Sequence, residues 1–152
     1  MADISATNDV TASIIRKVLT PTAGSNKGQI EVVAEVTIDP GTADAYPAGG
    51  VSLYSMFTAS DSNDTGIDPT KPVYGMAGNL VSSLVTTLSG NVHFLDGAAT
   101  ALGKTVQMWS RESATETLGE IGLTEFAASN IVTQLGTTGT YTFMLHLWGT
   151  ER

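Results

Sequence analysis

Apolar and polar residues alternate most regularly between Gln29 and Asp39. The apolar residues at every second position are Ile30, Val32, Ala34, Val36 and Ile38, and Glu31, Val33 and Glu35 stand between them. A period of two places alternate side chains on opposite faces of a strand, whereas a helix would spread them around its axis. The pattern therefore predicts a half-buried antiparallel strand with all five apolar residues inside. Asp39-Pro40-Gly41 should end it, since proline has no N–H to donate.

The second clear alternation covers residues 140–148. One face carries Tyr141, Phe143, Leu145 and Leu147, and the other carries Thr142, Met144, His146 and Trp148. Because both faces are largely apolar, the pattern predicts a central strand that is covered on both sides.

Weaker strand patterns cover residues 11–20, 73–77, 80–88, 92–95 and 105–111, with a short mixed apolar run at 51–57. Glycine, proline, serine and asparagine mark turns at 21–27, 46–50, 89–91 and 136–139, and 58–72 is a long loop. Residues 123–129 are predicted to form one or two helical turns. We expect an all-β fold, namely a single-domain antiparallel β-sandwich or barrel (jelly-roll-like) with roughly seven to nine strands and at most one short helix. The domain spans residues 11–152, and residues 1–10 form an N-terminal arm that is flexible or docks on a partner.

The composition narrows the classes of partner. A chain of 152 residues suits one core, and its net charge of −8 with scattered basic residues argues against nucleic-acid binding. The absence of cysteine excludes disulfides and thiolate metal sites. We expect no signal peptide, no membrane partner and synthesis in a cytoplasm, because no basic leader and no long apolar run is present.

Residues 61–68 resemble the first half of a calcium loop, since Asp61, Asn63 and Thr65 precede a glycine. A bidentate glutamate should close such a site, but that position is Pro72. The sequence therefore favours a solvated loop and no metal site, while cation binding by this loop stays open.

Neither histidine indicates a catalytic or metal site. His93 and His146 lie inside strand patterns without neighbours at ligand spacing. Glu31 and Glu35 share a strand face, but four residues separate them by about 13 Å, which is too far for paired acid–base work. We expect no catalytic residue, no cofactor and no enzyme activity.

The two tryptophans, Trp109 and Trp148, are the remaining candidates for a binding surface. If exposed, either could serve as a platform for sugars or as a protein interface. Aromatic side chains supply much of the buried area in a small domain, so both are expected in the core.

The order of features resembles that of the small β-sandwich proteins that decorate the capsids of tailed bacteriophages. The residues that carry the resemblance are a first strand with Ile14-Ile15-Arg16-Lys17-Val18, the strand 32–39, the turn Tyr46-Pro47-Ala48-Gly49-Gly50 with Val51-Ser52-Leu53, and the final strand 143–149.

The resemblance implies a virion protein that binds the outside of the shell and stabilises it. Its partners would be the major capsid protein and other copies of itself, with a trimer as the expected oligomer. The alternative is a carbohydrate- or receptor-binding β-sandwich module of a phage tail or cell surface. That module would use Trp109 or Trp148, together with a cation in the 61–68 loop.

Overall fold

The computed structural model describes residues 4, 9–21, 27–40, 44–58, 63–78, 91–111, 123–125 and 140–152. Within them the chain forms eight strands, one short α-helix and one 3₁₀ turn. The elements are β1 (Val10–Thr20), β2 (Gln29–Ile38), β3 (Val51–Ser52), α1 (Tyr54–Thr58), β4 (Tyr74–Ala77), β5 (Asn91–Asp96), η1 (Ala101–Gly103), β6 (Lys104–Arg111), β7 (Leu123–Glu125) and β8 (Tyr141–Thr150).

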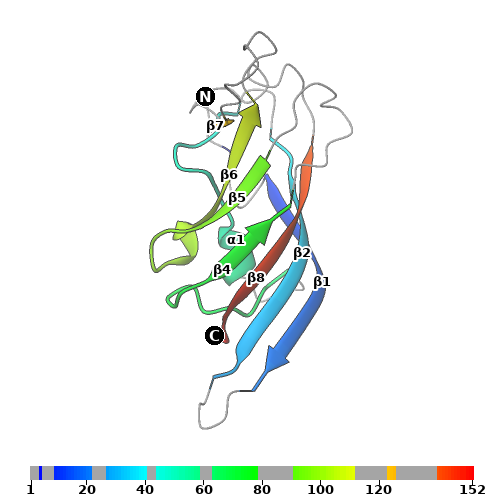
Figure 1. Cartoon of the computed structure of the whole chain (residues 1–152), viewed down its shortest axis with the longest axis vertical. Helices are drawn as coiled ribbons and strands as arrows, with labels where there is room; N and C mark the ends of the chain where they lie inside the picture. The colour runs from blue at the N-terminus through cyan, green and yellow to red at the C-terminus, as the bar shows by residue number, and fades with distance from the viewer. Residues whose placement is uncertain are drawn as a thin grey trace.

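The first sheet has the order β1-β2-β8-β4, and all of its pairs are antiparallel (Figure 1). The strands β2 and β8 pair along their whole length, from Gln29 opposite Thr150 to Ile38 opposite Tyr141. The register of β1 against β2 shifts between Ile14 and Arg16, where β1 bulges. The last strand of the described chain is thus an inner strand of its sheet.

The second sheet is built around β6. The strand β5 pairs with one side of β6, while β3 and β7 also pair with β6 at residues 105–106 and 109–111 respectively. The two sheets share one set of buried side chains, so the arrangement is sandwich-like. The all-β antiparallel prediction is confirmed, whereas a jelly-roll-like order of connections stays a prediction.

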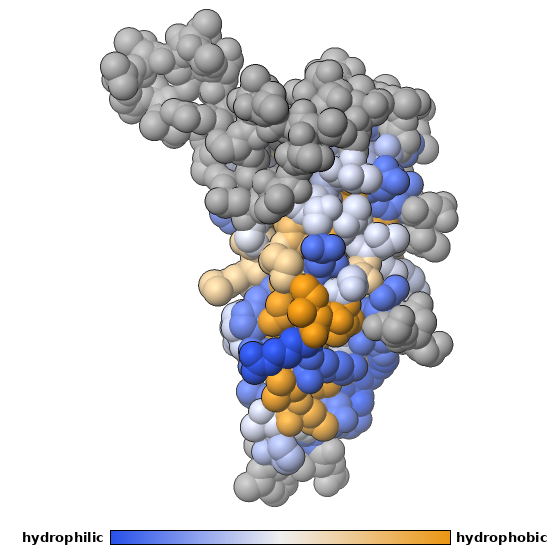
Figure 2. Space-filling model, turned by 90° about the vertical axis from the view of Figure 1, so that its right-hand side faces the viewer, coloured by the Kyte–Doolittle hydropathy of each residue, from blue (hydrophilic) through white to orange (hydrophobic). Residues whose placement is uncertain are grey.

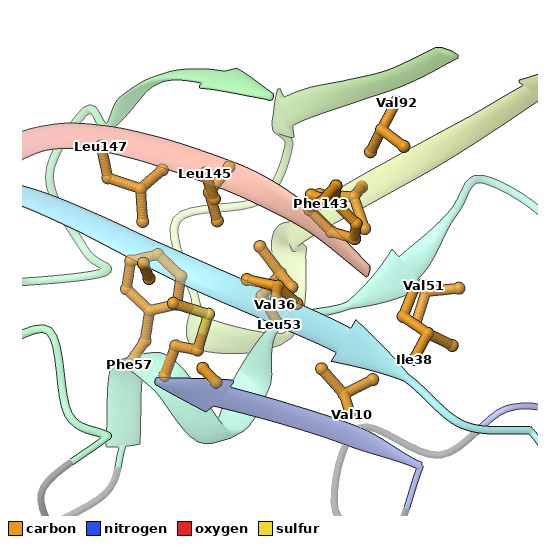
Figure 3. Close-up of a cluster of buried hydrophobic side chains, with 14 of the residues drawn as sticks. Val10, Val36, Ile38, Val51, Leu53, Phe57, Val92, Phe143, Leu145 and Leu147 are labelled. Carbon is orange, nitrogen blue, oxygen red and sulfur yellow. The ribbon is translucent and has the colours of Figure 1, made fainter. Parts of the chain in front are cut away.

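The core lies between the sheets and is closed by α1. Figure 3 shows Phe143, Leu145 and Leu147 of β8 directed into the same space as Leu53 and Phe57. All of these side chains are at most 1% exposed. Burial of this size is the main favourable contribution to the folding of such a domain.

The two clearest sequence patterns place their residues as predicted. Every predicted inward residue of β2 is buried, namely Ile30, Val32, Ala34, Val36 and Ile38. The predicted inward residues of β8 are buried as well, namely Tyr141, Phe143, Leu145 and Leu147. The predicted central position of β8 in its sheet is also confirmed. The prediction that its other face is buried as well is wrong for Met144, which is 39% exposed.

Two local predictions need correction. The helical turns expected at 123–129 are wrong for residues 123–125, which form β7 because β6 offers them a free edge. The short helix lies instead at Tyr54–Thr58, within the mixed apolar run, where it buries Met56 and Phe57 against the core. The predicted strand 80–88, the turns at 89–90 and 136–139, and residues 126–129 fall outside the described residues.

The predicted turn at 46–50 is present. Gly50 donates its N–H to the carbonyl of Pro47 over 3.1 Å, and Gly49 and Gly50 have φ values of 86° and 104°. Only glycine adopts such angles without strain, so the pair allows the reversal into β3.

The described part of the N-terminal arm packs on the domain. Ile4 is 5% exposed, belongs to the core, and donates its N–H to the carbonyl of Ala45 over 2.9 Å. The strand β1 already begins at Val10. The other arm residues before Asp9 lie outside the described residues, and docking of the arm on a partner stays a prediction.

Candidate binding surface

The outer face of the β1-β2-β8-β4 sheet carries apolar and aromatic side chains where an open antiparallel sheet usually carries polar ones. Cross-strand pairs share a face, so the registers group the outward residues into rows. One row joins Glu35 to Met144. The next joins Val33, His146 and Met76, and a third joins Glu31, Trp148 and Tyr74. We call these three rows the sheet-face patch.

Several side chains of the sheet-face patch are open to solvent. Tyr74 is 71% exposed and Met76 is 64% exposed, while Ile15 of the β1 bulge is 60% exposed on the neighbouring strand. Figure 2 views the molecule from the β1 side and shows hydrophobic residues gathered at mid-height and crossed by a hydrophilic band. Exposed aromatic and methionine residues are enriched at protein interfaces.

A polar rim lies beyond each end of the patch. At one end Thr37 pairs with Thr142, and their hydroxyl oxygens are 3.1 Å apart. At the other end Gln29 pairs with Thr150. An apolar centre between polar rims is the usual anatomy of a recognition surface.

A hydrogen bond and a ring stack organise the centre of the patch. Nε2 of His146 donates to Oε1 of Glu31 over 2.9 Å, because an ionised carboxylate can only accept. The His146 ring also lies 3.9 Å from the Trp148 ring, centre to centre, with their planes tilted by 30°. Glu31 and Trp148 thus hold the imidazole in one orientation.

A shallow hollow of about 300 Å³ lies beside this cluster. Its lining is mostly apolar and consists of Val33, Met76, Ala77, Gly78, Met144, Leu145 and His146. Gly78 donates its N–H to the carbonyl of Met144 over 2.7 Å, so the chain continues alongside β8 there without a side chain. The missing side chain leaves the room that the hollow occupies.

The size of the face suits a moderate interface. Strands lie about 4.8 Å apart and outward residues about 6.7 Å apart along a strand, so three strands over five rows and β4 over two rows cover roughly 500 Å². A stable interface of standard size buries about 800 Å² on each partner. The face alone therefore supports binding that gains strength from repetition or from neighbouring contacts.

The outer face of the second sheet holds the other tryptophan. Trp109 is half-buried. Its ring and the His93 ring meet edge to face, with the ring centres 5.9 Å apart. Among the described residues its Nε1 is buried without a hydrogen-bond partner. The core prediction is wrong for Trp109 and Trp148, because both alternate with inward residues and neither joins the core.

The carboxylates of the 61–68 loop are used within the protein. Asp64 accepts from the guanidinium of Arg152 and from the N–H of Gly66, and Arg152 also donates to the carbonyl of Phe57 over 2.7 Å. Asp61 lies outside the described residues. The described carboxylates therefore fasten the loop to the end of β8, which does not fit a cation cage.

Asp68 is the clearest perturbed acid in the described chain. The Thr70 hydroxyl donates to its carboxylate over 2.7 Å and the Thr70 N–H over 2.9 Å, and both bonds hold the pKa of Asp68 below its usual value. Lys71 and Lys27 lower this pKa further. Because the folded pKa is depressed, the stabilisation is present above the unfolded pKa and is lost as the pH falls through the folded pKa.

Replacing Thr70 by valine should raise the pKa of Asp68 toward its usual value, because the largest stabilising hydrogen bond of the carboxylate is removed. Carbon-detected NMR titration of the side-chain carboxyl measures the change. Replacing Lys71 by glutamine is the control and should raise the pKa less, since screening by water weakens an exposed charge pair. A larger rise in the Lys71 variant would contradict this ordering.

A buried lysine fastens the second sheet near η1. Lys104 is 1% exposed, and its Nζ lies 2.5 Å from Oδ1 of Asp96 and 3.0 Å from the carbonyl of Ala98. The other Asp96 oxygen accepts from the N–H of Val73 over 3.0 Å. The charge is therefore paired and hydrogen-bonded, as burial of a charge requires. This cluster holds together β4, β5 and β6.

The described residues bring together no group of three or more metal-ligating side chains. Glu31 and Glu35 lie on the outer face of β2, as predicted, while His93 and His146 occupy different sheets. None of the helices in the described part of the chain has the length and apolar character needed to cross a lipid bilayer.

Sequence reasoning missed Tyr74 and Met76 as surface residues and missed the hollow beside Gly78. The signal was present in β4, where Tyr74 and Met76 alternate with Gly75 and Ala77. The small residues face inward, because a Cβ at Gly75 would lie 2.5 Å from the Phe94 ring. The alternation of small and large residues along β4 could therefore have indicated that Tyr74 and Met76 face outward.

Comparison of the chain with models of protein families, with curated protein sequences and with solved structures found no match.

Proposed function

We propose that this chain is a non-enzymatic virion protein that decorates and stabilises the capsid of a tailed bacteriophage. It binds the outside of the shell through the major capsid protein, after synthesis in the host cytoplasm. The resemblance in the order of strands and turns suggests this role. The observation that supports it most is the exposed sheet-face patch, whose most exposed residues, Tyr74 and Met76, lie on the edge strand β4 beside the inner strand β8.

The patch explains how such a protein could bind without a catalytic or cofactor site. A face of roughly 500 Å² gives modest affinity at one site, but copies arranged around a symmetry axis bind with the combined strength of several contacts. Self-association into a trimer would supply that arrangement. Neither nucleic acid nor membrane is needed as a partner.

The test has two stages. Quantitative mass spectrometry of purified virions should find the chain in a fixed ratio to the major capsid protein, and its absence from heads would end the proposal. The purified protein should then bind heads from which it has been removed.

The second stage uses matched exposed hydrophobic residues. Met76→Asp on the patch should weaken co-sedimentation with heads at least about tenfold, since a buried charge costs more than 1.4 kcal/mol. Leu102→Asp in η1 is the control, because Leu102 is 65% exposed and lies off the patch. Equal losses in both variants would show that binding does not use this face.

A carbohydrate- or receptor-binding module is the second candidate. The observation that favours it is the pairing of Tyr74 with Trp148 on an exposed sheet face beside the Glu31 carboxylate. Aromatic rings stack on sugars and carboxylates accept from hydroxyl groups. Binding to a glycan array that is lost in Tyr74→Ala, together with absence from heads, would favour this function over the first.

A further inference from the structure

We propose that the hollow beside Gly78 receives an arginine or lysine side chain of the partner protein. The aliphatic stem would lie against the hollow's apolar lining, and the charged end would pair with Glu35. This inference rests on the proposed function only in assuming that the partner is a protein. It adds which kind of side chain of that partner enters the hollow and which charge it meets there.

The lining of the hollow suits a long flexible stem. Met76 and Met144 adapt to the shape of a bound chain because their side chains are unbranched, and Val33 adds apolar surface. Arginine and lysine bury their methylene groups on such surface while the charge stays near water.

The negative charge of this face favours a bound side chain with a basic end over one with an apolar or acidic end. Glu35 is the cross-strand partner of Met144, so its exposed carboxylate stands at the margin of the hollow. Glu31 is the other carboxylate of the patch, and it is already bonded to His146. No described hydrogen bond or ion pair engages the Glu35 carboxylate, so it is available to a partner.

The net charge of the chain supports a different protein as the main source of this side chain. Two copies that each carry a charge of −8 repel one another, whereas a basic group on a partner is attracted to the face. The nearest basic residue on the outer face is Arg16 of β1, which stands opposite Val33 on the side of β2 away from β8 and β4.

The experiment uses the isolated protein and small probes. N-acetyl-arginine amide and N-acetyl-lysine amide carry the charge, and N-acetyl-norleucine amide has a similar stem without it. Methyl NMR signals of Met76 and Met144 report occupancy of the hollow. We expect both charged probes to shift these signals and norleucine amide to bind about threefold more weakly, because a pair between solvent-exposed charges adds only modest affinity.

Two variants locate the site. Glu35→Gln should lower the affinity for the arginine probe about threefold by removing the charge pair. Asp39→Asn is the matched control, because it removes the same charge from an exposed position at the end of β2, beyond the rim. Equal losses in the two variants would mean that only net charge matters, which overturns the proposal.

A third variant fills the hollow. A Cβ at Gly78 would meet no atom closer than 3.6 Å, and Gly78 is not among the glycines with positive φ. Gly78→Val should therefore fold normally and lose the shifts at Met76 and Met144. Shifts that persist in this variant would overturn the proposal.

The remaining outcomes are also decisive. Equal binding of norleucine and arginine amides would show a merely apolar hollow, and shifts caused by methyl glycosides but not by the basic probes would assign it to sugars. No shift with any probe up to its solubility limit overturns the proposal as well. Because no capsid is involved, each result is independent of whether the chain is found in virions.

Discussion

Replacing Gly50 by alanine should lower the free energy of unfolding by about 3–5 kcal/mol, because the added methyl group meets both backbone strain and a clash at this position. Gly50 has a φ of 104°, and a Cβ at this position would lie 2.6 Å from the carbonyl oxygen of Val106. The neighbouring atom is backbone of β6, so it cannot move aside as a flexible side chain would. Urea denaturation followed by circular dichroism measures the change.

Gly49 is the matched control for Gly50. Its φ of 86° is also positive, but a Cβ there would meet nothing within 4 Å. Gly49→Ala should therefore cost only the backbone strain, about 1–2 kcal/mol. If the two alanine variants were equally stable, the turn could not lie as close to the backbone of β6 as the structure places it.

Replacing Phe143 by alanine should lower the free energy of unfolding by about 3–5 kcal/mol, because the ring leaves a cavity in the core. Phe143 is 1% exposed and lies on the inner face of β8. That loss is a large part of the 5–15 kcal/mol that typically stabilises a domain. Thermal and urea unfolding both measure it.

Met144 provides the control on the opposite face of the same strand. It is 39% exposed, so Met144→Ala should change the free energy of unfolding by less than about 1 kcal/mol. The same variant should weaken binding at the sheet-face patch. A loss of stability equal to that of Phe143→Ala would mean that the outer face of β8 is covered after all.

The inward residues of β2 and β8 could be predicted because their alternation is regular and long. Five successive inward positions of β2 carry apolar residues, and a shift by one residue would expose all of them. The turn at Gly49 and Gly50 was equally readable from its glycines.

The outer face of β8 could not be predicted from its sequence. Met144, His146 and Trp148 look as apolar as a second buried face, yet all three are partly exposed in the structure. Exposure of a central strand depends on what lies above the sheet. That information is not contained in the alternation of one strand.

The buried charge of Lys104 was also hidden from sequence reasoning. A lysine at the start of a strand usually indicates a solvent-exposed edge. Its partner Asp96 stands opposite it only because β5 and β6 form a hairpin closed by η1. Helix α1 was missed for a related reason, since a run of five residues is too short to show helical periodicity.

The position of β8 has a consequence for how the chain is made. Gln29 pairs with Thr150, so the first sheet cannot close until the ribosome has synthesised the chain as far as Thr150. Until then the apolar face of β2 and its free edge have no partner, and pairing over so long a loop is slow. We therefore expect the first sheet to form only after β8 has left the ribosome. Nascent chains would then be most prone to aggregate just before β8 emerges.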